Sequence, residues 1–139
     1  MPIQYRSMTL DDYDAVYELW KSTPGIGLSE ADSREEIDKF LKYNPGRCFV
    51  ALDGDVLIGA IMCGCDGRRG YLHHLAVRPQ YRQQGIGRQL VEECMNALRA
   101  TGIDKAHIFV FKDNESGKVF WRNAGWQERE DLVVMSRMV

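Results

Sequence analysis

The sequence predicts an α+β fold in which a mixed sheet of about six or seven strands packs against about four helices. Short apolar segments separated by tight turns fill the middle of the chain, which is typical of antiparallel strands. A glycine loop, a long amphipathic segment and another apolar strand follow, which is the pattern of a right-handed parallel crossover. The chain has 139 residues and no evident linker, so we expect residues 1–139 to form a single domain.

The first third of the chain predicts one strand and two helices. Apolar and polar residues alternate over residues 3–7, which indicates the strand. Thr9 precedes Asp12 by three residues, the spacing of a capping box, and apolar residues at helical spacing follow. Ser33 and Glu36 repeat that spacing, so we expect a second helix to begin there.

The middle of the chain predicts three antiparallel strands. Residues 48–52 and 56–62 flank Asp53-Gly54-Asp55, and Asp-Gly is a favoured dipeptide in hairpin turns. Residues 71–77 then form the next strand, and Pro79 ends it because proline cannot donate a ladder hydrogen bond.

The remaining elements follow the glycine loop. Apolar residues lie on one face of a helix from Gly85 to about Ala100. Residues 106–111 predict a strand parallel to the strand before the loop. Residues 116–123 predict a short helix, and residues 127–139 predict one or two closing strands.

Composition narrows the classes of function. Lys and Arg number 18 and Asp and Glu 20, giving a net charge of −2, so we expect no nucleic-acid or anionic-membrane partner. No apolar run approaches the ~20 residues of a membrane span. Arginines nevertheless gather between Arg68 and Arg88, which suits a small anionic ligand.

The four cysteines predict no metal site. Cys63 and Cys65 have a C-x-C spacing without a second ligand pair, whereas Cys48 and Cys94 lie among apolar residues and are typical of a core. Reduced thiols and the absence of a signal-like segment predict a cytoplasmic protein.

The segment from Val77 to Gly87 carries the clearest functional signal, because it joins a strand end to a helix start. Backbone N–H groups at a helix start and the positive end of the helix dipole favour a phosphate. A strand-to-helix turn without a ligand is the alternative. The segment is neither a Walker loop nor the dinucleotide fingerprint, whose third glycine is replaced by Leu90.

These residues resemble motif A of the GNAT acetyltransferases. Leu75-Ala76-Val77 precedes Arg82-Gln83-Gln84-Gly85-Ile86-Gly87, which matches the family's [RQ]-x-x-G-x-[GA] pattern. The segment from Asn114 through Trp121 to Trp126 is similar to a later motif of the family. The resemblance therefore covers nearly the whole chain.

The resemblance implies a GNAT fold with a V-shaped slot for acetyl-CoA, the cosubstrate. Amides of the loop would hold the CoA pyrophosphate, the strand edge would pair with the pantetheine arm, and the N–H of Val77 or a neighbour would polarise the thioester carbonyl. The implied cofactor-binding residues are Leu75, Ala76, Val77, Arg82, Gln83, Gln84, Gly85, Ile86, Gly87, Arg88, Asn114 and Trp121.

An acceptor amine needs a base, because an alkylammonium is unreactive while protonated. Two histidines occupy the places of Tyr71 and His73 in the arylalkylamine branch of the family, and His73 is retained here. Regular alternation places Tyr71, His73, Leu75 and Val77 on one face and Leu72, His74 and Ala76 on the other. We expect His73 to be the base; a bulge would invert the alternation, so His74 stays open. Both histidines could instead serve packing.

The leaving thiolate has no assigned acid. Many members of the family place a tyrosine where Trp121 stands, and tryptophan has no useful acidity. Tyr71 or water could protonate the thiolate, and a thiol of pKa ~8.5 leaves tolerably well without an acid. Trp121 could equally be a core residue.

The resemblance implies direct acetyl transfer to a primary amine, and the lack of an acidic groove in the sequence favours a small-molecule acceptor. A protein N-terminus or lysine is an alternative acceptor. A non-catalytic acyl-CoA sensor on the same scaffold is another, because of the change to Trp121. Members of the family are often homodimers, which makes a homodimer a further expectation.

Overall fold

Five strands form one sheet in the order β1-β2-β3-β4-β5 within residues 2–139, which are the residues that the computed structural model describes. The strands are β1 (Gln4–Ser7), β2 (Phe49–Asp53), β3 (Val56–Cys65), β4 (Gly70–Val77) and β5 (Ala106–Ile108). The first four strands pair antiparallel, and β5 pairs parallel to β4, as the crossover pattern predicts.

The helices are α1 (Tyr13–Lys21), α2 (Arg34–Tyr43), α3 (Ile86–Ala100) and α4 (Glu115–Asn123), with short 3-10 turns η1 (Leu10–Asp12), η2 (Glu30–Asp32) and η3 (Pro79–Tyr81). Chain contacts separate a unit that ends at Phe109 from a unit of Val110–Val139. The sheet, α1, α2 and α3 belong to the first unit, and α4 belongs to the second. No helix within residues 2–139 combines the length and apolar character needed to cross a membrane.

The predicted capping boxes have different outcomes. Asp12 accepts from the Thr9 N–H at 2.9 Å, so the first box is confirmed, although it begins the η1 turn that leads into α1. Ser33 accepts from the Glu36 N–H at 3.3 Å at the start of α2. Only this half of the second box forms, because the N–H of Ser33 donates instead to the Glu30 carbonyl and closes the η2 turn.

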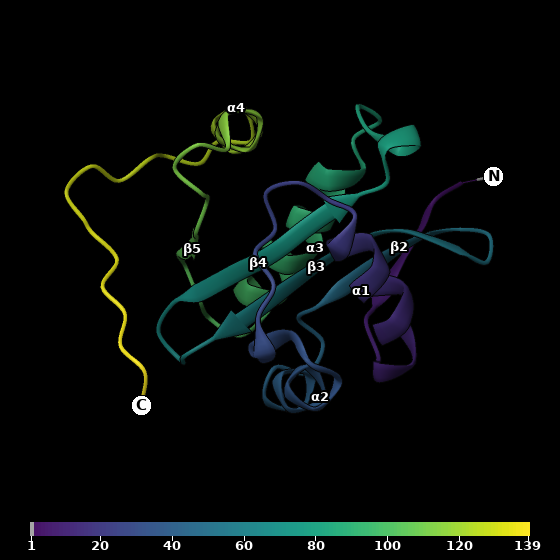
Figure 1. Cartoon of the computed structure of the whole chain (residues 1–139), viewed down its shortest axis with the longest axis horizontal. Helices are drawn as coiled ribbons and strands as arrows, with labels where there is room; N and C mark the ends of the chain where they lie inside the picture. The colour runs from purple at the N-terminus through teal and green to yellow at the C-terminus, as the bar shows by residue number, and fades with distance from the viewer. Residues whose placement is uncertain (1) are drawn as a thin grey trace. The chain divides into compact units, whose positions relative to one another are not determined.

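The two faces of the sheet are covered by different helices (Figure 1). A Cβ added to Gly70 would lie 2.5 Å from a methyl carbon of Leu98, so the face of the sheet toward which this Cβ would point packs against α3. A Cβ on Gly64 would lie 2.9 Å from the ring of Phe40, so the opposite face meets α2. Helix α1 also covers the face on the Gly64 side, so we call it the α1–α2 face. It holds the core cluster that includes Val16, Trp20 and Ile37.

The predicted sixth and seventh strands are wrong for the described residues, because residues 127–139 adopt no strand. This segment begins with a charged run in which Arg129 pairs with Asp131 at 3.0 Å, two residues away. Its apolar side chains, including Val133 and Met135, are largely exposed. A short apolar segment becomes a strand only where another strand edge receives it, and the segment alone does not supply that edge.

Close packing between β4 and α3 predicts a compensating pair of substitutions. Gly70→Ala should lower the free energy of unfolding by about 1–3 kcal/mol, because the new methyl group overlaps the buried Leu98 side chain. In a Leu98→Ala background the same change should cost much less, because the space is already vacated. Urea denaturation of the four proteins measures this coupling, and additive effects would contradict the packing described.

Candidate functional site

Strands β4 and β5 are paired over only three positions. The pairs are Gly70 with Ala106, Tyr71 with His107, and Leu72 with Ile108. Strand β4 continues to Val77 without a further partner on that side, so the two strands part after Leu72. The backbone of β4 after Leu72 is therefore unpaired on this side within residues 2–139, and we call this stretch the open edge of β4.

Hydrogen bonds between β4 and β3 show which backbone groups of β4 point toward β3 and which point toward its open edge. The Arg78 N–H donates to the Ile58 carbonyl at 2.8 Å, which directs Arg78 toward β3. Backbone groups alternate in direction along a strand, so the N–H and carbonyl of Val77 point to the opposite edge. The Arg82 guanidinium donates to that carbonyl at 3.1 Å, and the Val77 N–H lies beside it.

The loop between β4 and α3 turns sharply at two left-handed residues. Gln83 has φ 62° and Gly85 has φ 80°, and such residues direct successive N–H groups toward a concave surface. The first helical bond runs from the Gln89 N–H to the Gly85 carbonyl at 3.0 Å. The N–H groups of Ile86 and Gly87 precede it and lie outside the helical ladder.

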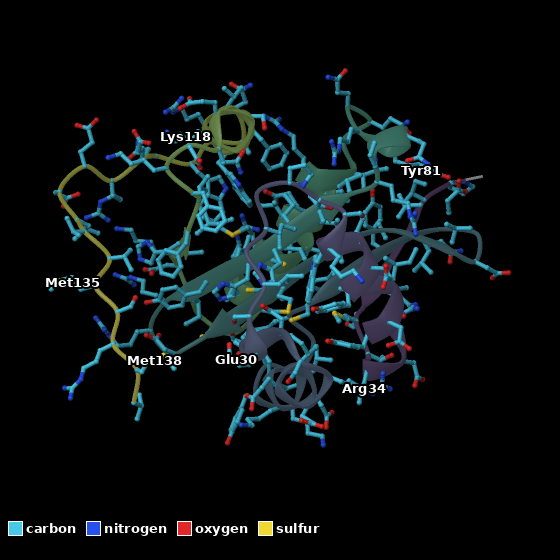
Figure 2. The ribbon with its side chains drawn as sticks, in the orientation of Figure 1. Glu30, Arg34, Tyr81, Lys118, Met135 and Met138 are labelled. Carbon is cyan, nitrogen blue, oxygen red and sulfur yellow. The ribbon has the colours of Figure 1, made fainter. Side chains whose placement is uncertain are left out.

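The same loop has side chains suited to an anion and an anchor to the sheet. Arg82 lies at its start, and Arg88 lies in the first turn of α3, where the helix dipole is positive. Tyr81, labelled in Figure 2, donates from its hydroxyl to Asp53 at 2.6 Å. The loop is thereby held beside the end of β4, where an anionic group would meet both backbone amides and arginines.

Strand β4 contains a bulge at His74. Ala76 pairs with Ala60 and His73 pairs with Met62, so β4 has one more residue than β3 in this stretch. His74 takes up the extra residue with φ 54°, a left-handed conformation that is uncommon outside glycine.

The bulge inverts the predicted alternation. His73 contacts Phe40 of α2, with ring centroids 6.0 Å apart, and His74 contacts Trp20 of α1 at 4.9 Å. Ala76 belongs to the core cluster of the α1–α2 face. The prediction that regular alternation separates His73 from His74 is therefore wrong, since both imidazoles lie on the α1–α2 face.

His74 is bound to Asp32, a residue that the sequence analysis missed. His74 Nε2 lies 2.9 Å from Asp32 Oδ1, and their side chains are 20% and 6% exposed. Asp32 Oδ2 also accepts from the Ser29 N–H at 3.0 Å. The segment carrying Asp32 lies between Glu30 and Arg34, which Figure 2 labels. The sequence signal for Asp32 is the spacing Ser29-x-x-Asp32, a further capping-box spacing that comes directly before Ser33.

His73 is half-buried and, unlike His74, has no carboxylate within hydrogen-bonding distance among the described contacts. Burial lowers its pKa below the usual 6.5, the neighbouring His74 lowers it further, and Asp32 partly opposes both. The imidazole is therefore favoured in its neutral form, which is the form that accepts a proton.

Tyr71 lies on the same side of the strand as His73 and stacks against His107, with ring centroids 5.7 Å apart. His107 was not predicted as a site residue. His73 and His74 thus directly follow the last paired position of β4, and His107 lies within the paired stretch of β5. Only their shared place in the sheet reveals this grouping, because His107 is far from the other two in sequence.

The second unit contains the two remaining predicted residues, and it is described by itself. Asn114 caps α4, where its side-chain oxygen accepts from the Gly117 N–H at 3.0 Å. Trp121 is buried and lies edge-on to Phe120 and Trp126, with centroids 5.1 and 5.0 Å away. These contacts give Asn114 a capping role and Trp121 a core role within their own unit. No group of three or more metal-binding side chains is arranged for a metal ion within residues 2–139.

Comparison with known proteins gives a consistent result. Residues 13–126 match the model of the acetyltransferase (GNAT) family. An acetyltransferase of Pectobacterium atrosepticum is 31% identical over 137 residues, which cover 99% of this chain and 96% of that protein.

Two solved structures share the fold. AAC(6')-Iy in complex with the bisubstrate analog CoA-S-monomethyl-acetylneamine has a TM-score of 0.79 and 17% identity, with 100% of each chain covered. The NatC complex bound to Gag peptide and CoA has a TM-score of 0.76 and 22% identity, covering 88% of this chain and 83% of that chain.

The lowered pKa of His73 predicts how stability depends on pH. The unfolded chain takes up a proton near pH 6.5, whereas folded His73 does so only at lower pH, so the free energy of unfolding should fall as pH falls through this interval. In a His73→Gln variant the fall should be shallower. Urea denaturation at a series of pH values measures both slopes, and equal slopes would show that folded His73 has an ordinary pKa.

Proposed function

The chain belongs to the GNAT acetyltransferase family, which uses acetyl-CoA as the acetyl donor, and on that premise we propose that it transfers the acetyl group directly to a primary amine of a small molecule. The observation that carries the proposal is the unpaired edge of β4 beside the loop from Arg82 to Gly87. One surface offers a strand edge to an extended chain and a set of amides to a phosphate.

The residues present fit acetyl-CoA in two separate ways. The pantetheine arm contains amides that can pair with the open edge of Leu75-Ala76-Val77 as an added strand would. The pyrophosphate suits the N–H groups of Gln83, Gln84, Gly85, Ile86 and Gly87, with Arg82 and Arg88 supplying positive charge. The N–H of Val77 then lies where it can donate to a thioester carbonyl.

His73 is the residue that we assign as base. Its neutral imidazole accepts a proton from the acceptor ammonium, directly or through one water, and the free amine then attacks the thioester carbonyl. The nitrogen loses its second proton as the carbon–sulfur bond breaks, and CoA leaves as a thiolate, which receives that proton through Tyr71 or water. Trp121 is not needed as an acid in this scheme, since tryptophan cannot supply a proton at useful pH.

A small-molecule acceptor is favoured over a basic protein segment by the local charges. Asp32 is the carboxylate bound at the histidine pair, and it is buried and already paired with His74. It therefore offers no exposed negative charge to a lysine-rich peptide. The fold itself does not decide, because AAC(6')-Iy is seen with an acetylneamine analog and NatC with a peptide. A protein amine is therefore the second candidate acceptor.

The free thiols of the four cysteines suit a reducing, cytoplasmic setting.

Charge at the loop can be tested separately from its backbone conformation. Gly85→Asn and Gly85→Asp both introduce residues that tolerate a positive φ, and open space surrounds the position of the new Cβ. Gly85→Asp should weaken acetyl-CoA binding by roughly tenfold to a hundredfold relative to Gly85→Asn, because only the aspartate repels the pyrophosphate. Isothermal titration measures both affinities, and equal values would place the pyrophosphate elsewhere.

The reaction itself is tested by release of CoA thiol from acetyl-CoA in the presence of pooled small amines and, separately, of peptides with free N-termini or lysines. We expect release with a small-amine pool. His73→Ala should lower kcat/KM most at acid pH, where the acceptor most needs a base. Release only with peptides would reverse the acceptor assignment, and binding without any release would favour the sensor.

A further inference from the structure

Asp32 and His74 connect the segment between α1 and α2 to the bulge of β4. The carboxylate of Asp32 can only accept hydrogen bonds, so the 2.9 Å contact uses an N–H on His74 Nε2. The hydroxyl of Tyr13 donates to the Asp32 carbonyl at 2.6 Å, and the indole of Trp20 donates to the His74 carbonyl at 3.0 Å. Both partners of the pair are thus fixed from α1 as well.

These contacts stabilise a backbone conformation that is unfavourable by itself. A histidine at φ 54° persists only where its surroundings hold it, and here the ring is held by Asp32 and the carbonyl by Trp20. Without the bulge, regular pairing would turn neighbouring side chains of β4 to opposite faces. His73 is in register with Met62 of the same core cluster, so it lies on the α1–α2 face in either case, and the left-handed conformation of His74 is what brings the second imidazole to that face.

We propose that Asp32 and His74 are a positioning pair that holds a second imidazole beside that of His73 on the α1–α2 face for deprotonation of the acceptor, an inference that rests on the function proposed above. Neither residue touches the acetyl donor in this scheme. Asp32 fixes the ring of His74, and His74 fixes the bulge and places its imidazole next to that of His73.

The charges that face His73 come from two elements. His74 lies on β4 itself, with ring centroids 6.5 Å apart, and Asp32 lies on η2. Phe40 from α2 and the β3 register partner Met62 are uncharged. His74 lowers the pKa of His73 and Asp32 raises it, so replacing His74 by a neutral residue should leave the effect of Asp32 and raise the pKa of His73.

The pH arm of the test uses His74→Asn, because asparagine tolerates a left-handed backbone, and His74→Gln as a second variant. Proton NMR of the free protein follows the His73 ring, with His107 as an internal reference. We expect the His73 midpoint to rise in both variants, and kcat/KM to fall at least ~3-fold more near pH 6 than near pH 8.5. An unchanged or lowered midpoint overturns the proposal, whether or not an acceptor has been found.

The positioning arm compares Asp32→Asn with Asp12→Asn. Asp12 is a matched control, since it is also buried, accepts the N–H of its capping residue at 2.9 Å and pairs with Arg6 at 2.8 Å. We expect Asp32→Asn to lower kcat by roughly tenfold or more without changing acetyl-CoA affinity, whereas Asp12→Asn lowers stability alone. Equal losses of kcat in Asp32→Asn and Asp12→Asn would overturn the positioning role proposed for Asp32 and His74. A wild-type protein that binds acetyl-CoA but never releases thiol would instead contradict the proposed function, and the NMR result would still stand.

Discussion

The candidate site depends on how one strand uses its two edges. Strand β4 is paired with β3 over its whole length, but with β5 only up to Leu72. Antiparallel pairing on one edge keeps the strand rigid, while the parting of β5 leaves the other edge open. A buried, fixed strand with an unpaired edge is uncommon, because an open edge exposes N–H and carbonyl groups that seek partners. In the proposed function the pantetheine arm of acetyl-CoA supplies them.

The elements around that edge are arranged to keep it available. The Arg82 side chain covers the Val77 carbonyl, and Tyr81 ties the following turn to Asp53. The loop then enters α3 with its left-handed residues and free helical N–H groups next to the open edge. The strand and the loop thus form one continuous surface of backbone donors, and this surface depends little on the identity of the side chains.

The bulge at His74 adds side-chain chemistry to that backbone surface. It turns the His74 imidazole to the face covered by α1 and α2, where His73 already lies, whereas α3 covers the other face. The conformation is held by contacts from Trp20 of α1 and Asp32 of η2. Helix α1 therefore stabilises the core and, together with η2, also sets the position of His74.

Local features of the site could be predicted from sequence, whereas features that arise from pairing could not. The start of α3 and the turn before it are encoded locally by Gly85 and by helical spacing, and both were predicted. Whether β4 bulges at His74 was left open, because a bulge is a property of two strands together. Asp32 was missed because its capping spacing looks like an ordinary helix start, and its second partner is 42 residues away. The closing strands were overpredicted because the apolar residues within 127–139 have no strand edge to receive them.

Backbone hydrogen exchange with and without CoA tests the central claim most directly. If the open edge of β4 and the loop before α3 together hold the ligand, saturating CoA should slow exchange of the Val77 amide and of the amides of residues 83–87. The Arg78 amide, which already donates to Ile58, should change little and serves as the internal control. Slowed exchange confined to other segments, while CoA is bound, would contradict the account.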